Sequence, residues 1–179
     1  MNSDANANSN AGLPAAALEL VLPLGRFEGR EAFSQLIRDA LRVAARDGWH
    51  EMVWADASFE DWPLGERAVV ESLQAWAKTG RSLTLVATRY DGVLRSLPRF
   101  VTWCKTWSHI IEARQCRNED PLDFPSAIWS RGWVMQRLDL NHSAGVSGPE
   151  PARRVALREL LGEKIRGSSP GFPASTLGL

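Results

Sequence analysis

The stretch SLTLVAT at residues 82–88 indicates most clearly which fold the chain adopts. Its leucine-rich and β-branched residues follow one another without polar alternation, which is typical of a strand buried on both faces of a sheet. Both faces of such a strand are covered by helices, which the crossover connections between parallel strands supply. The stretch therefore predicts an α/β fold with a parallel sheet and helices on both faces.

The segments on either side continue the same alternation of strand and helix. Pro98 cannot donate a backbone hydrogen bond and is expected to begin a new helical piece, with Ser96 as its cap. We expect strands at 17–24, 51–56 and 109–115, and helices at 30–46, 64–78 and, with an interruption, 92–108. This order predicts one α/β domain with a mostly parallel sheet.

The C-terminal third adds a different element. The stretches SAIWS at 126–130 and WVMQRLDL at 133–140 are expected to form a late antiparallel strand pair about Arg131-Gly132, followed by a helix at 150–165. The resulting organisation has a disordered segment at 1–13, an α/β domain at 14–166 and a Pro/Gly/Ser-rich tail at 167–179.

Composition narrows the classes of partner. Lysine and arginine number 21, aspartate and glutamate also 21, so the formal net charge is zero. This balance gives no global attraction to nucleic acid or to an anionic membrane. The chain shows neither a signal-peptide pattern nor a run of about 18 apolar residues. We therefore expect a cytoplasmic protein with reduced thiols and no membrane partner.

The stretch FVTWCKTWSHIIEARQC at 100–116 gathers aromatic, cationic and thiol side chains. Two cysteines, Cys104 and Cys116, are too few and too widely spaced for a zinc site, so we expect no metal and no cofactor. Helical spacing favours an amphipathic helix with a buried thiol. An alternative is a basic helix face that binds phosphate or a partner, made by Arg95, Arg99 and Lys105. A Cys104 nucleophile with His109 as base is disfavoured, since the two belong to different elements.

Polar residues at the expected carboxyl ends of the strands form the candidate ligand site, because ligands of open α/β sheets bind at that edge. These residues are Asp56, Arg89, Arg114 and Asp139.

Each of these residues has a second interpretation. The carboxylates of ADASFEDW at 55–62 suit a metal or a general base, although Asp61 is more simply a helix cap. Arg89 and Arg114 either clamp an oxyanion or join ion pairs with Asp56 or Asp91. In DLNHSAG at 139–145, neighbours in sequence do not by themselves make a catalytic triad.

The C-terminal tail carries the apolar residues Phe172, Leu177 and Leu179 among serine, proline and glycine. Three interpretations remain open for it. The tail docks on its own domain, or a partner protein captures it through these apolar side chains, or it simply frays.

Four stretches resemble an uncharacterised proteobacterial family: WADASFEDWPL (54–64), LPRFVTWCKTWSHIIEAR (97–114), PSAIWSRGWVMQRLD (125–139) and SSPGFPASTLGL (168–179). The order of elements from Val53 onward resembles single-domain, degenerate members of the phospholipase-D-like superfamily. Active members carry a His-x-Lys motif whose histidine attacks phosphorus. Here Ser126 and Ile128 align with that histidine and lysine, and His50, His109 and His142 are followed two positions later by Met52, Ile111 and Ala144. The resemblance thus implies a phospholipase-D-like half without the phosphodiesterase machinery.

Three functions follow from these patterns. The leading hypothesis is a non-catalytic binding or adaptor protein, with a protein partner held by the tail, by the basic helix face, or by both. The main alternative is a phosphoryl- or nucleotide-handling enzyme that uses the four strand-end residues. The third is a weak nucleic-acid binder.

Overall fold

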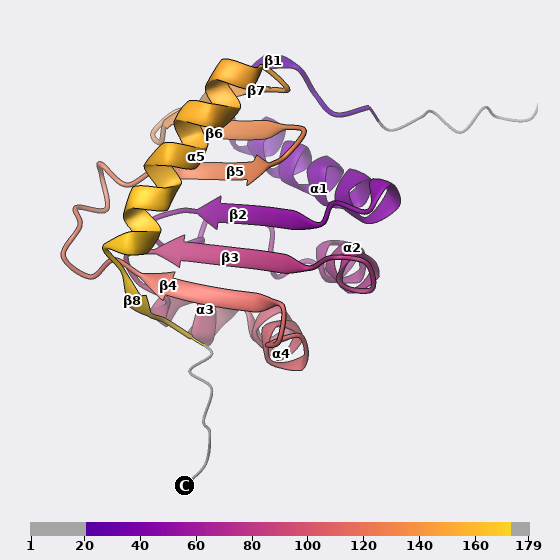
Figure 1. Cartoon of the computed structure of the whole chain (residues 1–179), viewed down its shortest axis with the longest axis vertical. Helices are drawn as coiled ribbons and strands as arrows, with labels where there is room; N and C mark the ends of the chain where they lie inside the picture. The colour runs from indigo at the N-terminus through magenta and orange to yellow at the C-terminus, as the bar shows by residue number, and fades with distance from the viewer. Residues whose placement is uncertain (1–20, 173–179) are drawn as a thin grey trace, which may run out of the picture.

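The computed structural model describes residues 21–172, which fold around one eight-stranded sheet (Figure 1). The strand order across the sheet is β1-β7-β6-β5-β2-β3-β4-β8. The strands are β1 Gly25–Phe27, β2 Glu51–Ala55, β3 Ser82–Ala87, β4 Ile111–Gln115, β5 Ser126–Ser130, β6 Val134–Asp139, β7 Ala144–Gly148 and β8 Ser169–Pro170.

Strand directions correct one expectation about the sheet. Only the pairs β2·β3 and β3·β4 are parallel, and the other five neighbouring pairs are antiparallel. The prediction of a mostly parallel sheet is therefore wrong. Helical crossovers join β2, β3 and β4, whereas β5, β6 and β7 follow one another through short turns, which permit only antiparallel pairing. The late antiparallel strand pair is confirmed as β5·β6.

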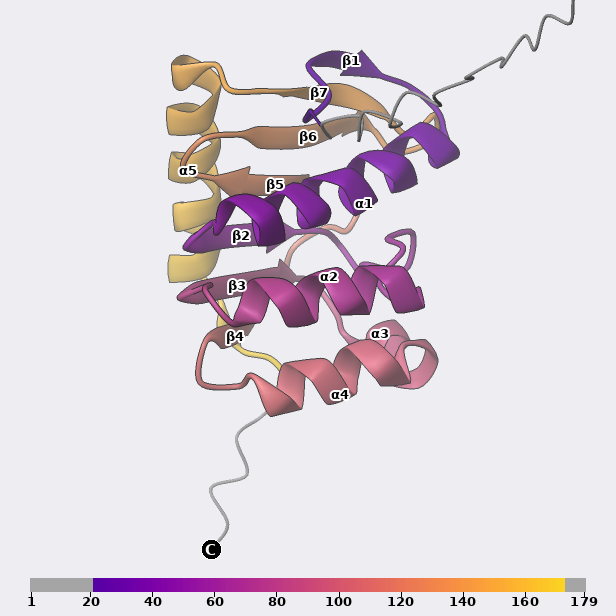
Figure 2. The ribbon, with the colours of Figure 1, turned by 90° about the vertical axis from the view of Figure 1, so that its right-hand side faces the viewer.

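Helices cover both faces of the sheet, as expected (Figure 2). Four of them lie on one face and α5 lies across the other. Their bounds are α1 Arg30–Asp47, α2 Arg67–Ala77, α3 Asp91–Ser96, α4 Pro98–Thr106 and α5 Pro151–Arg166. Pro98 does begin α4, but the residue before it, Leu97, occupies the cap position without a side-chain hydrogen bond. Ser96 ends α3 instead, so the predicted serine cap is wrong.

The central strands divide the core between the two helical layers. In β2, Met52 and Trp54 are buried among the residues under α1–α4, and Val53 and Ala55 are buried among those under α5. Successive side chains of a strand point to opposite faces. The absence of polar alternation in these strands thus reflects two apolar layers, one on each side.

Two strands differ from the expected pattern. Of the strand expected at 17–24, residues 17–20 lie outside the described part, and the described remainder is not a strand. Pro23 there cannot donate to a ladder, and its carbonyl accepts hydrogen bonds from the Trp133 indole and the Ser147 hydroxyl instead. Strand β7 was not expected, because its sequence AGVSG is rich in small residues with low β-propensity.

The beginning of the tail belongs to the domain. Strand β8 pairs with β4, and the Gly171 amide donates to the Ala113 carbonyl at 2.8 Å. Phe172 is 8% exposed and packs edge-on against Tyr90, with ring centroids 4.9 Å apart. The domain therefore continues past residue 166 to Phe172, and this side chain is not free to contact a partner as predicted. Leu177 and Leu179 lie outside the described residues.

The docked tail predicts a measurable contribution of Phe172 to stability. Phe172→Ala should lower the free energy of unfolding by about 3 kcal/mol, since it removes a buried aromatic ring. Urea denaturation followed by tryptophan fluorescence measures the change. Leu122→Ala is the control, because Leu122 is 81% exposed and its loss should cost less than about 0.5 kcal/mol. Equal effects of the two substitutions would contradict docking.

Candidate functional site

The carboxylate of Asp56 lies buried at the carboxyl end of β2 and accepts four hydrogen bonds. One oxygen accepts from the backbone amides of Ser58 and Phe59, at 3.1 and 2.8 Å. The other accepts from the Trp62 indole and from the Arg137 guanidinium, both at 3.0 Å. All of its strong acceptor positions are therefore occupied by the protein itself.

Arg137, on β6, is the buried cation that pairs with Asp56. Its side chain is 3% exposed, and its other nitrogens donate to the Ser126 hydroxyl and to Asp61, at 3.1 and 3.3 Å. The guanidinium carbon also lies 4.2 Å from the centroid of the Phe33 ring. We call Asp56, Asp61, Ser126 and Arg137 the strand-end network.

The strand-end network is closed to ligands in this structure. Asp56 is 4% exposed and Ser126 is 1% exposed. A phosphate or carboxylate would have to displace Asp56 from Arg137 and leave a buried carboxylate without its counterion, which is costly. The arrangement is suited to holding the loop after β2 against β5 and β6.

The other predicted strand-end residues do not join this network. Arg89 lies 3.9 Å from Glu60, and Arg114 donates to the hydroxyl and carbonyl of Ser168 in the docked tail. Asp139 contacts His142 in the turn after β6. The four residues Asp56, Arg89, Arg114 and Asp139 thus have separate partners and form no common pocket. Contrary to the prediction, neither arginine pairs with Asp56 or Asp91; their acidic neighbours are Glu60 for Arg89 and Glu112 for Arg114.

Asp61 was expected to cap the helix that follows Pro63. Helix α2 instead begins at Arg67 with Glu66 in the cap position. Asp61 pairs with Arg137 on one oxygen and with Arg30 on the other. The capping prediction is wrong, because the buried arginine, which sequence spacing did not connect to this loop, attracts the carboxylate.

The pair of Asp139 and His142 is exposed. The His142 ring nitrogen lies 2.7 Å from Asp139 Oδ2. This contact lowers the pKa of Asp139 and raises the pKa of His142. Ser143 follows with a positive φ of 48°, and its hydroxyl forms no hydrogen bond with this histidine. The three residues form a turn and not a triad.

Both cysteines are buried and free of disulfides. Burial raises the pKa of Cys104 to about 12, so its thiol stays protonated and non-nucleophilic at neutral pH. Burial also raises the pKa of Cys116. The packing interpretation of the 100–116 stretch is confirmed, because Phe100, Trp103 and Cys104 all belong to the core.

Among the described residues no group of His, Cys, Asp and Glu is arranged to hold a metal, and no helix could cross a membrane.

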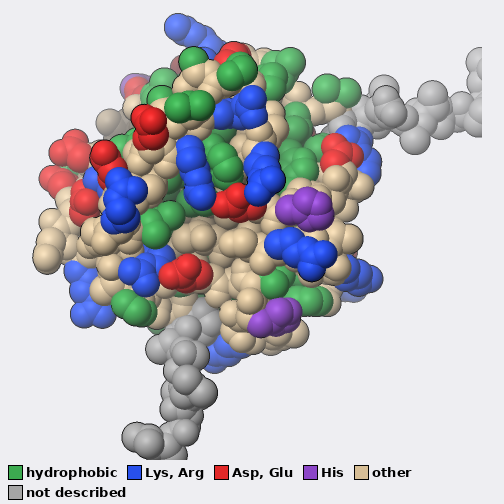
Figure 3. All heavy atoms as spheres, viewed as in Figure 1, with side chains coloured by type: hydrophobic (Ala, Val, Ile, Leu, Met, Phe, Trp, Pro, Cys, Tyr) green, Lys and Arg blue, Asp and Glu red, His purple; other side chains and the backbone are tan. Residues whose placement is uncertain are grey.

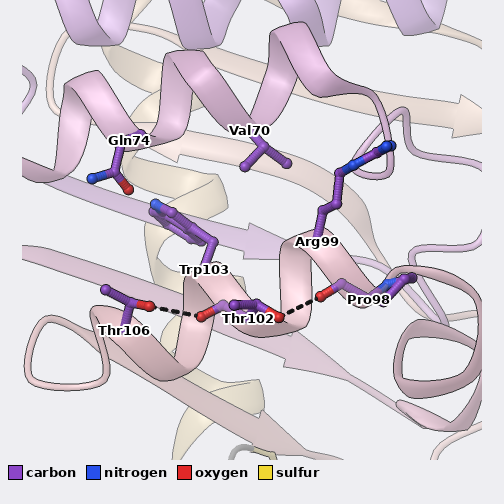
Figure 4. A pocket seen from close by; sticks show the side chains of 7 residues that line it. All are labelled: Val70, Gln74, Pro98, Arg99, Thr102, Trp103 and Thr106. Atoms are coloured by element: carbon purple, nitrogen blue, oxygen red, sulfur yellow. Dashed lines mark hydrogen bonds between the residues drawn. The ribbon is translucent and has the colours of Figure 1, made fainter.

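The predicted basic helix face is divided by the structure. Arg95 belongs to α3 and lies 3.7 Å from Asp91, whereas Arg99 and Lys105 belong to the separate helix α4. Arg99 lines a groove of about 450 Å³ between α2 and α4 (Figure 4). The lining residues are Val70, Gln74, Pro98, Arg99, Thr102, Trp103 and Thr106.

One wall of this α2–α4 groove contains an unsatisfied donor. The indole nitrogen of Trp103 is buried and has no hydrogen-bond partner within the described part of the chain, a property it shares with Trp54. A buried donor without an acceptor costs about 1–3 kcal/mol. Figure 4 shows the nitrogen-bearing side of Trp103 turned toward Gln74, whose oxygen accepts from the Trp107 indole at 2.9 Å.

A second exposed cluster lies where the parallel strands begin. The strand register pairs Glu51 with Ser82 and Leu83 with Ile111, so His50, Arg81 and His109 occupy one row just before β2, β3 and β4. The Arg81 amide donates to the His50 carbonyl at 2.8 Å. Figure 3 shows two histidine side chains with a cationic side chain between them along this side of the molecule.

Two lysines at helix ends extend this row. Lys78 follows the last residue of α2, and Lys105 lies in the last turn of α4. The Trp107–Gln74 hydrogen bond holds these two helix ends side by side. We call His50, Lys78, Arg81, Lys105 and His109 the basic edge. All five are exposed, and none forms an ion pair with a residue of the described range 21–172.

Acidic residues near the basic edge are already paired. Asp47 pairs with Arg46, and Glu51 is shared by Arg131 and Arg158. Glu112, on β4, lies 3.4 Å from Arg114. The basic edge therefore carries a local positive charge on a chain whose formal net charge is zero.

Sequence reasoning missed Arg137 and the basic edge. Alternation along β6 was the available signal for Arg137, since it shares a face with Met135, two residues earlier, which is fully buried. The row of His50, Arg81 and His109 carries no local signal, because its members lie far apart in the sequence and only the parallel register brings them together.

These features define a single-domain α/β protein with a mixed sheet and a closed network at its strand ends. No protein-family model matches the chain, and a search of curated proteins returned no relative. Among solved structures, the chain is similar to TrmBL2, described as an archaeal chromatin protein with a novel mode of DNA binding, at a TM-score of 0.62 and 14% identity. The match covers 88% of this chain and 58% of the TrmBL2 chain, so this chain spans little more than half the length of TrmBL2. This likeness establishes a shared fold.

The strand-end network predicts a large effect of removing its cation. Arg137→Met should lower the free energy of unfolding by about 3–5 kcal/mol, because Asp56 is left buried without its counterion. Chemical denaturation measures the loss. Adding Asp56→Asn to the same chain should recover part of it, since no buried charge then lacks a partner.

The matched control is Arg89→Met at the same end of the sheet. Arg89 is half-exposed, and its guanidinium lies as far as 3.9 Å from the Glu60 carboxylate. Because such an exposed ion pair is weak, its loss should change the free energy of unfolding by less than about 0.5 kcal/mol. If Arg137→Met proves no more harmful than Arg89→Met, the strand-end network does not hold the fold together.

Proposed function

We propose that this chain is a non-catalytic module that binds the phosphate backbone of nucleic acid, weakly and without sequence preference, through the basic edge. The observation that carries the proposal is the row of His50, Arg81 and His109 at the start of three parallel strands, extended by Lys78 and Lys105. Cationic side chains without internal partners are the groups that neutralise phosphates.

The geometry of the basic edge suits a linear polyanion. Neighbouring strands lie about 4.8 Å apart, so three residues in one register row span about 10 Å along the edge. Lys78 and Lys105 widen the row toward the helical face of the sheet. Such a line of donors contacts successive phosphates without reading bases, which favours affinity over specificity.

The non-catalytic part of the proposal is supported by the strand-end network. Asp56 has four internal donors, and Arg137 is engaged by Asp56, Asp61 and Ser126. The phosphoryl- or nucleotide-handling enzyme would need these groups, or Arg89, Arg114 and Asp139, to converge on a ligand. Their separate partners in the structure make this the weaker hypothesis.

The similarity to TrmBL2 adds to the proposal. That protein is described as binding DNA, and the shared fold covers most of this chain. At 14% identity, the DNA-binding residues of TrmBL2 cannot be assigned to positions of this chain. The proposal for the basic edge therefore depends on the charges of this chain alone. A cytoplasmic location is proposed together with this function.

The kinship with a proteobacterial family of phospholipase-D-like layout also remains a proposal. In that alignment Ser126 takes the place of the attacking histidine, and Ile128 that of the lysine. Here Ser126 accepts from Arg137, and Ile128 is fully buried. The kinship is therefore compatible with a fold retained for binding after loss of its phosphodiesterase chemistry.

The proposal predicts salt-dependent binding to nucleic acid. Fluorescence anisotropy of a short labelled duplex should give a slope of log K against log salt of about −2 to −3, because three full cations lie on the basic edge. Arg81→Gln should weaken binding and reduce the magnitude of that slope by about 1.

A charge-matched control separates this surface from a general effect of charge. Arg67→Gln removes one exposed cation, which is paired with Glu71, from the opposite end of α2, and should leave binding unchanged. If Arg81→Gln and Arg67→Gln both weaken binding, or if neither does, the basic edge is not the contact surface. A chain carrying glutamine at Lys78, Arg81 and Lys105 together should show no salt-dependent binding.

A further inference from the structure

We infer that the α2–α4 groove is a second binding site, distinct from the basic edge, and that it takes a peptide segment of a partner protein in which an acidic side chain stands beside an apolar one. The inference does not rest on the proposed nucleic-acid binding. It rests on the hydrogen-bonding groups that the groove offers and on its apolar walls.

The charged group and the buried polar group of the groove, Arg99 and the Trp103 indole, are donors. The hydroxyl protons of Thr102 and Thr106 are already used, since they donate to the carbonyls of Pro98 and Thr102 at 2.9 and 3.0 Å. Arg99 is exposed and forms no ion pair with a described residue. The Trp103 indole N–H has no acceptor among residues 21–172. A ligand that complements these two donors must therefore bring an acceptor for Trp103 and a negative charge for Arg99.

Gln74 explains how a ligand would reach the buried indole. Its carboxamide is exposed and lies over the nitrogen-bearing side of Trp103 in Figure 4. Its oxygen accepts from the Trp107 indole at 2.9 Å, and within the described residues it makes no hydrogen bond to Trp103. An acceptor on the ligand that displaces this exposed side chain would satisfy the Trp103 donor, which no described residue satisfies.

The shape and walls of the groove favour a peptide. Pro98, Thr102 and Thr106 follow one another at one-turn intervals along α4, so the groove extends about 12 Å along that helix. Val70 and the Trp103 ring supply apolar surface. A segment with an apolar side chain against these walls and a carboxylate on Arg99 satisfies both kinds of group, and an extended backbone carbonyl supplies the remaining acceptor.

A pair of capped peptides tests the charge requirement directly. The probes are acetyl-Leu-Glu-Leu-Leu-amide and the same peptide with Gln in place of Glu. Titration of the ¹⁵N-labelled full chain is followed through the Trp103 indole N–H signal, which is assigned by its disappearance in Trp103→Phe. The glutamate peptide should shift this signal with a Kd on the order of 1 mM or tighter, and the glutamine peptide should bind at least about fivefold more weakly.

Two substitutions locate the contact. Arg99→Gln should abolish the preference for the glutamate peptide, whereas Arg95→Gln should preserve it, because Arg95 pairs with Asp91 on α3 and does not line the groove.

Equal binding of the two peptides, or no shift of the Trp103 signal with either, overturns the inference. If acetyl-leucine with its free carboxylate binds as tightly as the glutamate peptide, the site belongs to small carboxylates and the peptide assignment is wrong. A shift of Trp103 by the labelled duplex in place of the peptides would likewise reject it.

Discussion

The ion pair between Asp56 and Arg137 is the interaction on which the arrangement of the sheet depends. It joins the loop after β2 to β6 across the intervening strand β5, whose Ser126 also accepts from Arg137. Two charges this deeply buried are tolerable only when every lone pair and donor has a partner, and here the backbone amides of Ser58 and Phe59 complete the set. Phe59 adopts a positive φ of 57°, a conformation that costs energy for a bulky residue and that the Asp56 hydrogen bonds hold in place.

The same pair explains how much of the candidate site could be predicted from the sequence. Asp56 was identified from its place at the end of a buried strand, because that position depends only on local pattern. Its partner lies 81 residues away, and no spacing rule connects them. Asp61 was assigned to a helix cap for the same reason, since a local role is the one that sequence can suggest. Long-range charge pairing decided the role of Asp61, and for Asp56 it added one distant cation to three donors that lie within six residues.

The helices and strands that were predicted correctly are those with a local apolar pattern, and those that were missed depend on distant partners. The helices at 30–46 and 64–78 and the central strands follow from apolar periodicity, and each appears within a few residues of its expected bounds. Strand β7 and the two residues of β8 carry no such pattern, because they are held by the partner strand and not by their own composition. The direction of the sheet was misjudged because the buried central strands were taken to represent all of it, whereas β5, β6 and β7 are linked by turns too short to permit parallel pairing.

The distribution of charge separates two surfaces on one neutral molecule. At the carboxyl ends of the strands, cations and carboxylates satisfy one another, so that region contributes to stability. At the opposite ends, the acids Asp47, Glu51 and Glu112 are committed to arginines of their own, and the basic edge is left with a local excess. The α2–α4 groove lies between the helices that end at this edge, but its donors face a separate hollow lined by Val70 and Trp103. Net charge is therefore a poor guide to the surface of this chain, because it averages paired charges with the few cations and donors that have no partner among the described residues.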